Sequence, residues 1–238
     1  MKIAFISDIH GNAVALEAVL ADLRKKNVDE VFVLGDICFR GPEPKRSLEI
    51  IRALNTDVIK GNADEWVVRG IDEGEVPQES LPIMEKERNW AVAKLTGDQI
   101  DYLQDLPTEL NLEFGNTKIH AFHATPNSLF DIVQPSSSDE ILENALFIKD
   151  ANIYIYGHIH KPYIRFLDGR CVINTGSVGL PFDGVARSSY VLIDLMADHV
   201  EASIVRVSYD VDKVIQQFTQ SDYPNKDFMM DVLKKSCL

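Results

Sequence analysis

The sequence predicts an α/β fold in which two mixed sheets pack face to face and helices cover their outer sides. Two patterns indicate this architecture. Over the first 60 residues, short β-rich segments alternate with helical ones, which is typical of parallel βαβ units. After about residue 108, β-rich segments flank two-residue turn sequences such as Gly115-Asn116, which indicates antiparallel hairpins. The 238 residues are enough to bury one core.

The N-terminal elements follow from the spacing of apolar residues. A short apolar strand at 2–7 leads to Asp8. The segment 12–26 has apolar residues at helical spacing and basic residues in its last turn, so we expect a helix there. A β-rich run at 30–34 predicts the next strand. Three further elements complete the N-terminal part of the chain, namely a helix at about 43–54, a strand at 57–60 and a loop at 61–64.

The rest of the chain divides into a polar helical segment, a β-rich half and a tail. The β-rich half is expected to contain three hairpins, which pair 108–114 with 117–124, 163–167 with 170–174, and 188–195 with 199–207. It is also expected to contain a helix at 139–147 and a strand at 152–156. Two short helices, at about 211–218 and 226–235, follow. We therefore expect a single domain over residues 1–238, with a helical cap at about 65–106 that ends before Pro107 and a C-terminal helical tail at about 208–238.

Composition limits the classes of function. The net charge of −13 argues against a long nucleic acid as the main partner, since proteins that bind one usually carry a basic face. It does not exclude a phosphorylated substrate, because bound cations can reverse the local sign of the charge. No stretch has the roughly 20 apolar residues of a membrane span. The three cysteines have no metal-site spacing and the first residues do not form a signal peptide, so we expect a cytoplasmic protein.

Side chains of the kinds that bind metals follow several predicted strands. They are Asp8 and His10, Asp36, Asn62, His123, and His158 and His160. Because α/β sheets bind ligands at the carboxyl ends of their strands, we expect these groups to meet. Carboxylate and imidazole ligands suit Mn, Fe, Ni or Zn. The two oxygens of Asp36 can bridge two ions, so the sequence predicts a site for two divalent metals.

A histidine by itself is more often a hydrogen-bonded core or surface residue than a ligand. We interpret His120 and His199 in that way. His120 lies three residues before His123 on one predicted strand, so the two side chains are expected to face opposite surfaces of the sheet. The other four histidines follow a strand or adjoin a Gly or Pro turn, which favours a metal site.

About the first 185 residues contain, in order, Asp8-x-His10, Gly35-Asp36, Gly61-Asn62, His123 and Gly157-His158-x-His160. In this order the motifs resemble the calcineurin-like metallophosphoesterase superfamily. The resemblance implies a four-layer α/β/β/α sandwich. It also implies that Asp8, His10, Asp36 and His160 bind one ion, and that Asp36, Asn62, His123 and His158 bind the other. A hydroxide between the ions would then attack phosphorus in line.

Three positions near these motifs bear on the subfamily. The stretch from Gly35 to Gly41 resembles protein Ser/Thr phosphatases and symmetrical diadenosine tetraphosphatases, in which its arginine binds phosphate, so Arg40 is a predicted catalytic residue. Lys60 falls where protein phosphatases have another arginine. The alternative is that both are ordinary surface charges.

Position 63 departs from the resemblance. Many relatives have a histidine there that protonates the leaving oxygen, whereas this chain has Ala63. Asp64 is retained and, with Asn62, completes the predicted catalytic residues, although it has no imidazole to orient. General-acid assistance is therefore in question, while metal-ion catalysis is not.

The resemblance implies a metal-dependent phosphodiesterase that acts on small-molecule or nucleotide substrates. Two alternatives are a symmetrical diadenosine polyphosphate hydrolase and a Ser/Thr protein phosphatase. A third, of another class, is a catalytically silent binding scaffold, but such a protein is expected to lose ligands and this chain keeps all seven. The sequence leaves open the physiological substrate, the native metals and whether the chain forms homo-oligomers.

Overall fold

Strands form the centre of the computed structural model, which describes residues 1–237. They are β1 (Lys2–Ile6), β2 (Glu30–Val33), β3 (Glu109–Phe114), β4 (Thr117–Phe122), β5 (Ile153–Tyr156), β6 (Tyr163–Leu167), β7 (Arg170–Asn174), β8 (Ser188–Leu195) and β9 (Val200–Val207). One sheet has the order β2-β1-β8-β9 and the other β3-β4-β5-β7-β6. Each contains parallel and antiparallel pairs, since β1 lies parallel to β2 and antiparallel to β8, and β4 lies parallel to β5 and antiparallel to β3.

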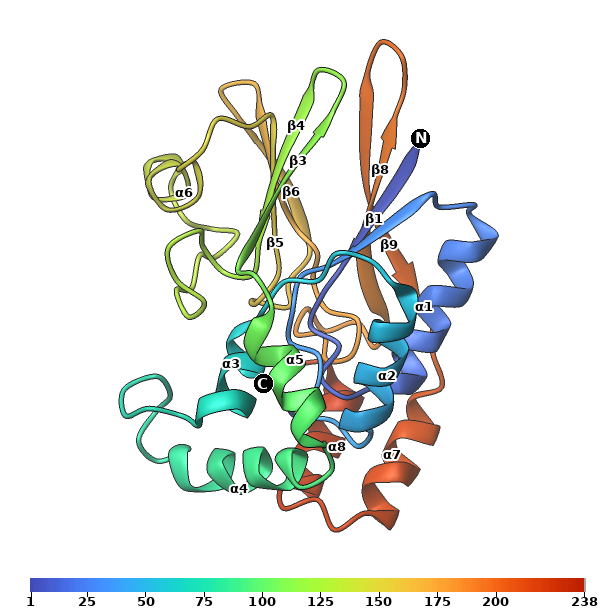
Figure 1. The fold of residues 1–238 in the computed structure, drawn as a ribbon, viewed down its shortest axis with the longest axis vertical. Coiled ribbons are helices and arrows are strands. Elements are labelled where there is room, and N and C mark those ends of the chain that lie inside the picture. The colour runs from blue at the N-terminus through green and yellow to red at the C-terminus, as the bar shows by residue number, and fades with distance from the viewer. Residues whose placement is uncertain (238) are drawn as a thin grey trace.

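Helices cover the outer sides of both sheets. They are α1 (Ala13–Lys25), α2 (Pro44–Leu54), α3 (Asn62–Arg69), α4 (Leu81–Val92), α5 (Gly97–Asp105), α6 (Asp139–Leu146), α7 (Val211–Gln220) and α8 (Lys226–Lys235). In Figure 1, α1 and α2 lie outside the β2-β1-β8-β9 sheet and α6 lies outside the other. The remaining helices gather at one end of the sheets. The predicted class, two mixed sheets flanked by helices, is confirmed.

The central strands β1 and β5 are apolar on both faces because they are covered on both sides. Ile3 and Phe5 of β1 pack between the sheets against Ile155 of β5 and Ile173 of β7. The alternate residue Ile6 points instead into the core shared with α1 and α2. Tyr154 and Tyr156 of β5 likewise belong to a separate core with α6. This alternation produces the four layers.

Three local predictions differ from the structure. The strand expected at 57–60 is wrong, because only a single parallel bridge joins Val58 to Val33 and the Lys60 amide then donates to Pro107. The loop expected at 61–64 is also wrong, since α3 begins at Asn62. The helical segment expected at 65–106 is interrupted after Gly70, whose φ of 100° cannot continue a helix.

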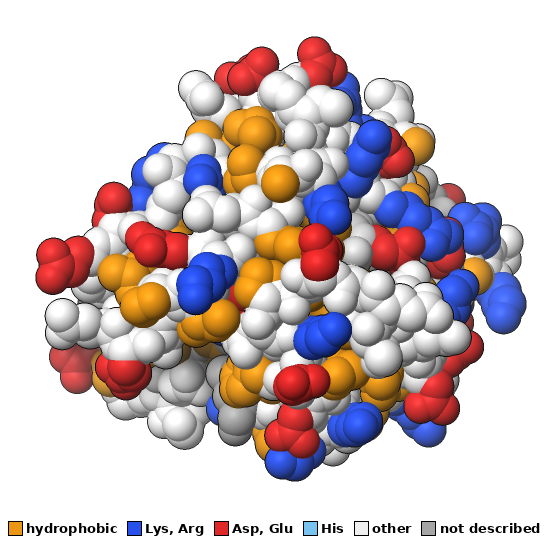
Figure 2. Space-filling model, turned by 90° about the horizontal axis from the view of Figure 1, so that it is seen from below, with side chains coloured by type: hydrophobic (Ala, Val, Ile, Leu, Met, Phe, Trp, Pro, Cys, Tyr) orange, Lys and Arg blue, Asp and Glu red, His pale blue; other side chains and the backbone are white. Residues whose placement is uncertain are grey.

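The end of the molecule that carries α4, α7 and α8 has a mixed surface. Figure 2 shows small hydrophobic areas between basic and acidic side chains there, with neither sign of charge forming a continuous field. Within residues 1–237, no helix combines the length and the apolar character that crossing a bilayer requires.

Candidate metal centre

The seven predicted metal ligands lie where strands end or where α3 begins. Asp8 and His10 follow β1, Asp36 follows β2, Asn62 opens α3, His123 follows β4, and His158 and His160 follow β5. Backbone hydrogen bonds tie the first two loops together, because the Asp8 amide donates to Gly35 at 3.0 Å and the His10 amide donates to Asp36 at 2.9 Å. The predicted ligands therefore meet at one edge of the two sheets.

These loops have an unusual backbone. Six of their residues other than glycine have a left-handed φ, namely Asp8 (54°), His10 (48°), Asp36 (58°), Arg40 (72°), His158 (68°) and His160 (55°). For such residues this conformation costs about 1–3 kcal/mol each, and it concentrates at functional sites. Sequence patterns gave no sign of it. The strain marks the same loops that the ligand motifs mark.

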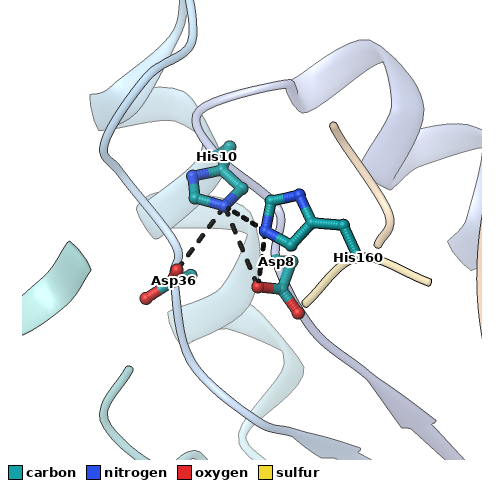
Figure 3. A group of neighbouring side chains, drawn as sticks. All are labelled: Asp8, His10, Asp36 and His160. Carbon is teal, nitrogen blue, oxygen red and sulfur yellow. Dashed lines mark hydrogen bonds and ion pairs between the residues drawn. The ribbon is translucent and has the colours of Figure 1, made fainter. Parts of the chain in front are cut away.

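Four side chains form a first donor group (Figure 3), which consists of Asp8, His10, Asp36 and His160. One ligand atom from each lies within 4.8 Å of all the others, and all four residues are buried. His10 Nε2 lies 3.1 Å from His160 Nε2 and 3.5 Å from Asp36 Oδ2. Asp8 Oδ1 lies 3.0 Å from His160 Nε2.

The hydrogen bonds of the first donor group fit a cation. His10 Nδ1 donates to the Phe39 carbonyl at 2.8 Å, and His160 Nδ1 donates to the Leu180 carbonyl at 2.5 Å. Because a carbonyl only accepts, Nδ1 of each ring carries a proton, and Nε2 of a neutral His10 ring presents a lone pair toward His160. Burial and the neighbouring His160 lower the pKa of His10 to about 4, so the His10 ring is neutral at pH 7. A divalent ion would satisfy both nitrogens.

Asp8 gives a second indication that the first donor group binds a cation. Its Oδ1 is buried and, among the residues that the structure describes, makes no hydrogen bond, although it lies 3.0 Å from His160 Nε2, because the His160 ring donates through Nδ1 to Leu180. Its Oδ2 is bound by the Ser7 hydroxyl and by the His158 amide, the latter at 3.1 Å. The Ser177 hydroxyl donates to the Asp8 carbonyl at 2.7 Å. The carboxylate is thus fixed with one oxygen left for a ligand, and Ser7 and Ser177 are supporting residues that the metal motifs do not include.

A second donor group lies on the other side of Asp36. Asn62 Oδ1 lies 2.9 Å from His123 Nε2 and 2.8 Å from His158 Nδ1. Asp36 Oδ1 lies 3.5 Å from His123 Nε2, while Oδ2 of the same carboxylate faces His10. Asp36 therefore stands between the two groups, where a bridging ligand would have to be.

The carboxylate of Asp36 and the burial of the second donor group change the pKa values of its two histidines. Burial acts to lower the pKa of His123, but the Asp36 carboxylate outweighs it and raises that pKa to about 10. Burial and His123 lower the pKa of His158 to about 4. Without a metal, His123 is protonated at pH 7, so a metal ion and a proton compete for its Nε2.

Asp64 connects the loops rather than facing the donor groups. It is fully buried, and its carboxylate accepts the amides of Asp36 at 2.7 Å, Ile37 at 2.9 Å and Gly61 at 3.0 Å. Burial and the Asp36 charge raise the pKa of Asp64 to about 7. The Ala63 amide donates to Asp36 Oδ1 at 2.8 Å. These bonds hold the start of α3 against the Asp36 loop.

Arg40 lies beside the first donor group. It lines a small hollow with His10 that the tail helices α7 and α8 close. Its Nε donates to the buried Glu87 of α4 at 3.2 Å, and the side-chain Nδ2 of Asn225 also donates to Glu87 at 2.8 Å. Within residues 1–237, Glu87 is the hydrogen-bond partner of the guanidinium, so both Nη groups are available to a ligand. No sequence pattern marked Glu87 or Asn225.

The other candidates have contacts elsewhere. Lys60 Nζ donates to Glu65 at 3.1 Å and to the Gln104 carbonyl at 3.0 Å, so its charge is used by α3 and α5. His120 is buried on β4 and lies 2.7 Å from Glu109, on the sheet face opposite to His123. His199 is exposed.

The chain belongs to the calcineurin-like phosphoesterase superfamily, whose domain matches residues 1–198. An uncharacterized protein of Methanocaldococcus jannaschii is 29% identical over 243 residues, which cover 93% of each chain. A metallophosphoesterase from Sphaerobacter thermophilus has a TM-score of 0.79 and 27% identity, and the match covers 99% of both chains. A hypothetical protein from Pyrococcus horikoshii has a TM-score of 0.84 and 22% identity, over 98% of this chain and 97% of that one.

Membership makes the chain a metal-dependent hydrolase that acts on phosphate esters. The buried aspartates and histidines of the first donor group are the residues of this chain that indicate binding of a divalent metal.

Proposed function

We propose that the chain is a dinuclear metal-dependent phosphodiesterase that acts on small-molecule or nucleotide substrates. One observation carries the proposal, namely that the Asp36 carboxylate lies between two donor groups, with Oδ2 toward His10 and Oδ1 toward His123. Mixed carboxylate and imidazole donors favour Mn, Fe, Ni or Zn. When bound, two such ions would polarise the phosphoryl oxygens and lower the pKa of a water molecule.

The residues of the chain then have distinct roles. One ion would be held by Asp8, His10, Asp36 and His160, and the other by Asp36, Asn62, His123 and His158. Arg40 would bind a non-bridging phosphate oxygen through its Nη groups and stabilise the charge that develops there. Asp64 is better described as a positioning residue than as a catalytic one, because both of its oxygens already accept backbone amides.

Reconstitution of metal-depleted protein tests the proposal. The protein is loaded with Mn, Fe, Ni, Zn or Mg and assayed on a phosphodiester, a phosphomonoester, diadenosine tetraphosphate and a phosphopeptide. We expect the diester to be hydrolysed fastest, with the rate rising until two ions are bound per chain. Full activity at one ion per chain would contradict the dinuclear site.

A symmetrical diadenosine polyphosphate hydrolase is the second candidate. It is favoured by the position of Arg40 beside His10, in the stretch from Gly35 to Gly41. A protein phosphatase has less support, because Lys60 is engaged by Glu65 and Gln104. Faster hydrolysis of diadenosine tetraphosphate than of the diester would favour the second candidate.

Arg40→Ala is expected to lower kcat/KM at least about tenfold, or ~1.4 kcal/mol, with no change in bound metal. The reason is the loss of a cation from the phosphate, while the ligands stay in place. Alanine also leaves the buried Glu87 without its ion pair, so Arg40→Lys, which keeps the charge but loses the planar fork, is measured beside it. Arg24→Ala, at an exposed position of α1, is the control. Unaltered kinetics in both Arg40 variants would mean that Arg40 does not bind the phosphate.

Alkyl esters are expected to be poor substrates relative to aryl esters and phosphoanhydrides. An alkoxide needs a proton as it leaves, and a positioned acid commonly contributes about 10²–10⁴-fold, but position 63 offers only a methyl group and His120 lies on the far sheet face. Methyl and p-nitrophenyl esters should be compared under the same metal loading. Equal rates would mean that another group supplies the proton.

A further inference from the structure

A cavity of about 370 Å³ opens beside the second donor group. Its wall includes His158 together with Ile132, Gln134, Lys161 and Phe182. Its volume falls in the range of small-molecule sites, which is about 300–1,000 Å³. One side chain, His158, therefore belongs both to the donor groups and to this cavity.

The cavity lies where the donor groups meet solvent. Six of the seven predicted ligands are buried, and His158 is the one that is partly exposed. A phosphate that reaches the donor groups from the His158 side has the rest of its molecule in the cavity. The occupant is therefore expected to be the organic part of the substrate.

The lining of the cavity is largely apolar. The Phe182 ring stacks on the His160 imidazole, with 4.3 Å between centroids and 20° between planes, which holds the phenyl group in place. Ile132 is 67% exposed and lines the same cavity. A flat apolar group between Ile132 and Phe182 would cover both.

The cavity also has two polar side chains, Lys161 and Gln134. Lys161 is exposed and lines the cavity, so its ammonium group can reach a negatively charged ligand there. Gln134 adds an amide that can both donate and accept.

We propose that this cavity binds the aromatic base of a nucleotide substrate, with the base against Phe182 and Ile132, Gln134 at its polar edge and Lys161 near a phosphate. The inference rests on the proposed function and narrows its substrate class from phosphodiesters in general to those that carry a nucleobase. Stacking of a base on an aromatic side chain is insensitive to which base is present, so the site is expected to accept several.

Adenosine monophosphate and ribose 5-phosphate test this, because they differ by the base. Their dissociation constants for metal-loaded protein are measured by calorimetry, which does not depend on turnover. We expect the wild type to bind the nucleotide about tenfold more tightly, in line with the contribution of base stacking. The combined variant Ile132→Ser with Phe182→Leu should bring the ratio close to one, and its metal content is measured in parallel because Phe182 stacks on His160. Lys161→Gln should weaken both ligands alike.

Ile141→Ser is the matched control, since Ile141 is also an exposed isoleucine, 53% accessible, but lies on α6 outside the cavity. Its ratio should equal that of the wild type. Equal affinity of the wild type for the two ligands, or a ratio that survives the combined variant, would overturn the base site. Failure of the proposed function is distinguishable, because the ratio would then be present while the metal-loaded protein cleaves no diester.

Discussion

Asp36→Asn is expected to abolish nearly all turnover and to lower metal occupancy while the fold persists. The two oxygens of Asp36 face different donor groups, so the loss of its charge weakens both groups at once. An asparagine oxygen can still accept the Ala63 amide that Asp36 Oδ1 accepts, so the start of α3 should stay in place. Metal analysis beside circular dichroism separates the two effects.

Asp101→Asn provides a control for the loss of one carboxylate, because Asp101 is an exposed residue of α5. It should keep the metal content and the rate of the wild type. Full activity of Asp36→Asn with normal metal binding would remove the dinuclear mechanism.

Gly61→Ala is expected to lower both activity and stability, although it changes no charge and no predicted ligand. A Cβ at this position would lie 2.1 Å from Asp36 Oδ1 and 2.5 Å from the Asp36 amide nitrogen. The φ of −102° at Gly61 suits alanine, so the effect is steric and acts on the Asp36 carboxylate. We expect a loss of about 1–3 kcal/mol in the free energy of unfolding. Thermal denaturation and metal titration measure it.

Gly97→Ala is the matched control for this substitution. Gly97 opens α5, and a Cβ there would meet nothing within 4 Å. It should leave activity unchanged and should not lower stability, since alanine is the better helix former. If Gly61→Ala also behaved like the wild type, the Asp36 loop would be able to move away without consequence.

Most of the fold and the donor groups could be predicted because their signals are local. Apolar periodicity identified the strands, and pairs such as Asp8 with His10 follow a strand directly. The pairing of Arg40 with Glu87 could not be predicted, because it joins residues 47 positions apart and no pattern selects one glutamate of a polar helix. Asn225 reaches Glu87 from 138 positions away. The strand expected at 57–60 was wrong because the Lys60 amide pairs with Pro107, a partner that the segment itself does not reveal.

In the loops whose residues have a left-handed φ, the side chains that would bind metal have a backbone cost that glycine would not have. At Asp8, His10 and Asp36 a glycine would relax the backbone, whereas the side chain present supplies donor atoms to the site and hydrogen bonds to the loops around it. A lineage that no longer required the reaction could lose these side chains, since only their hydrogen bonds to neighbouring loops, such as that of Asp36 Oδ1 with the Ala63 amide, would favour keeping them. Its two sheets would remain intact, because their cores do not include these residues. Descendants of such a lineage would keep the architecture and diverge first at the catalytic loops.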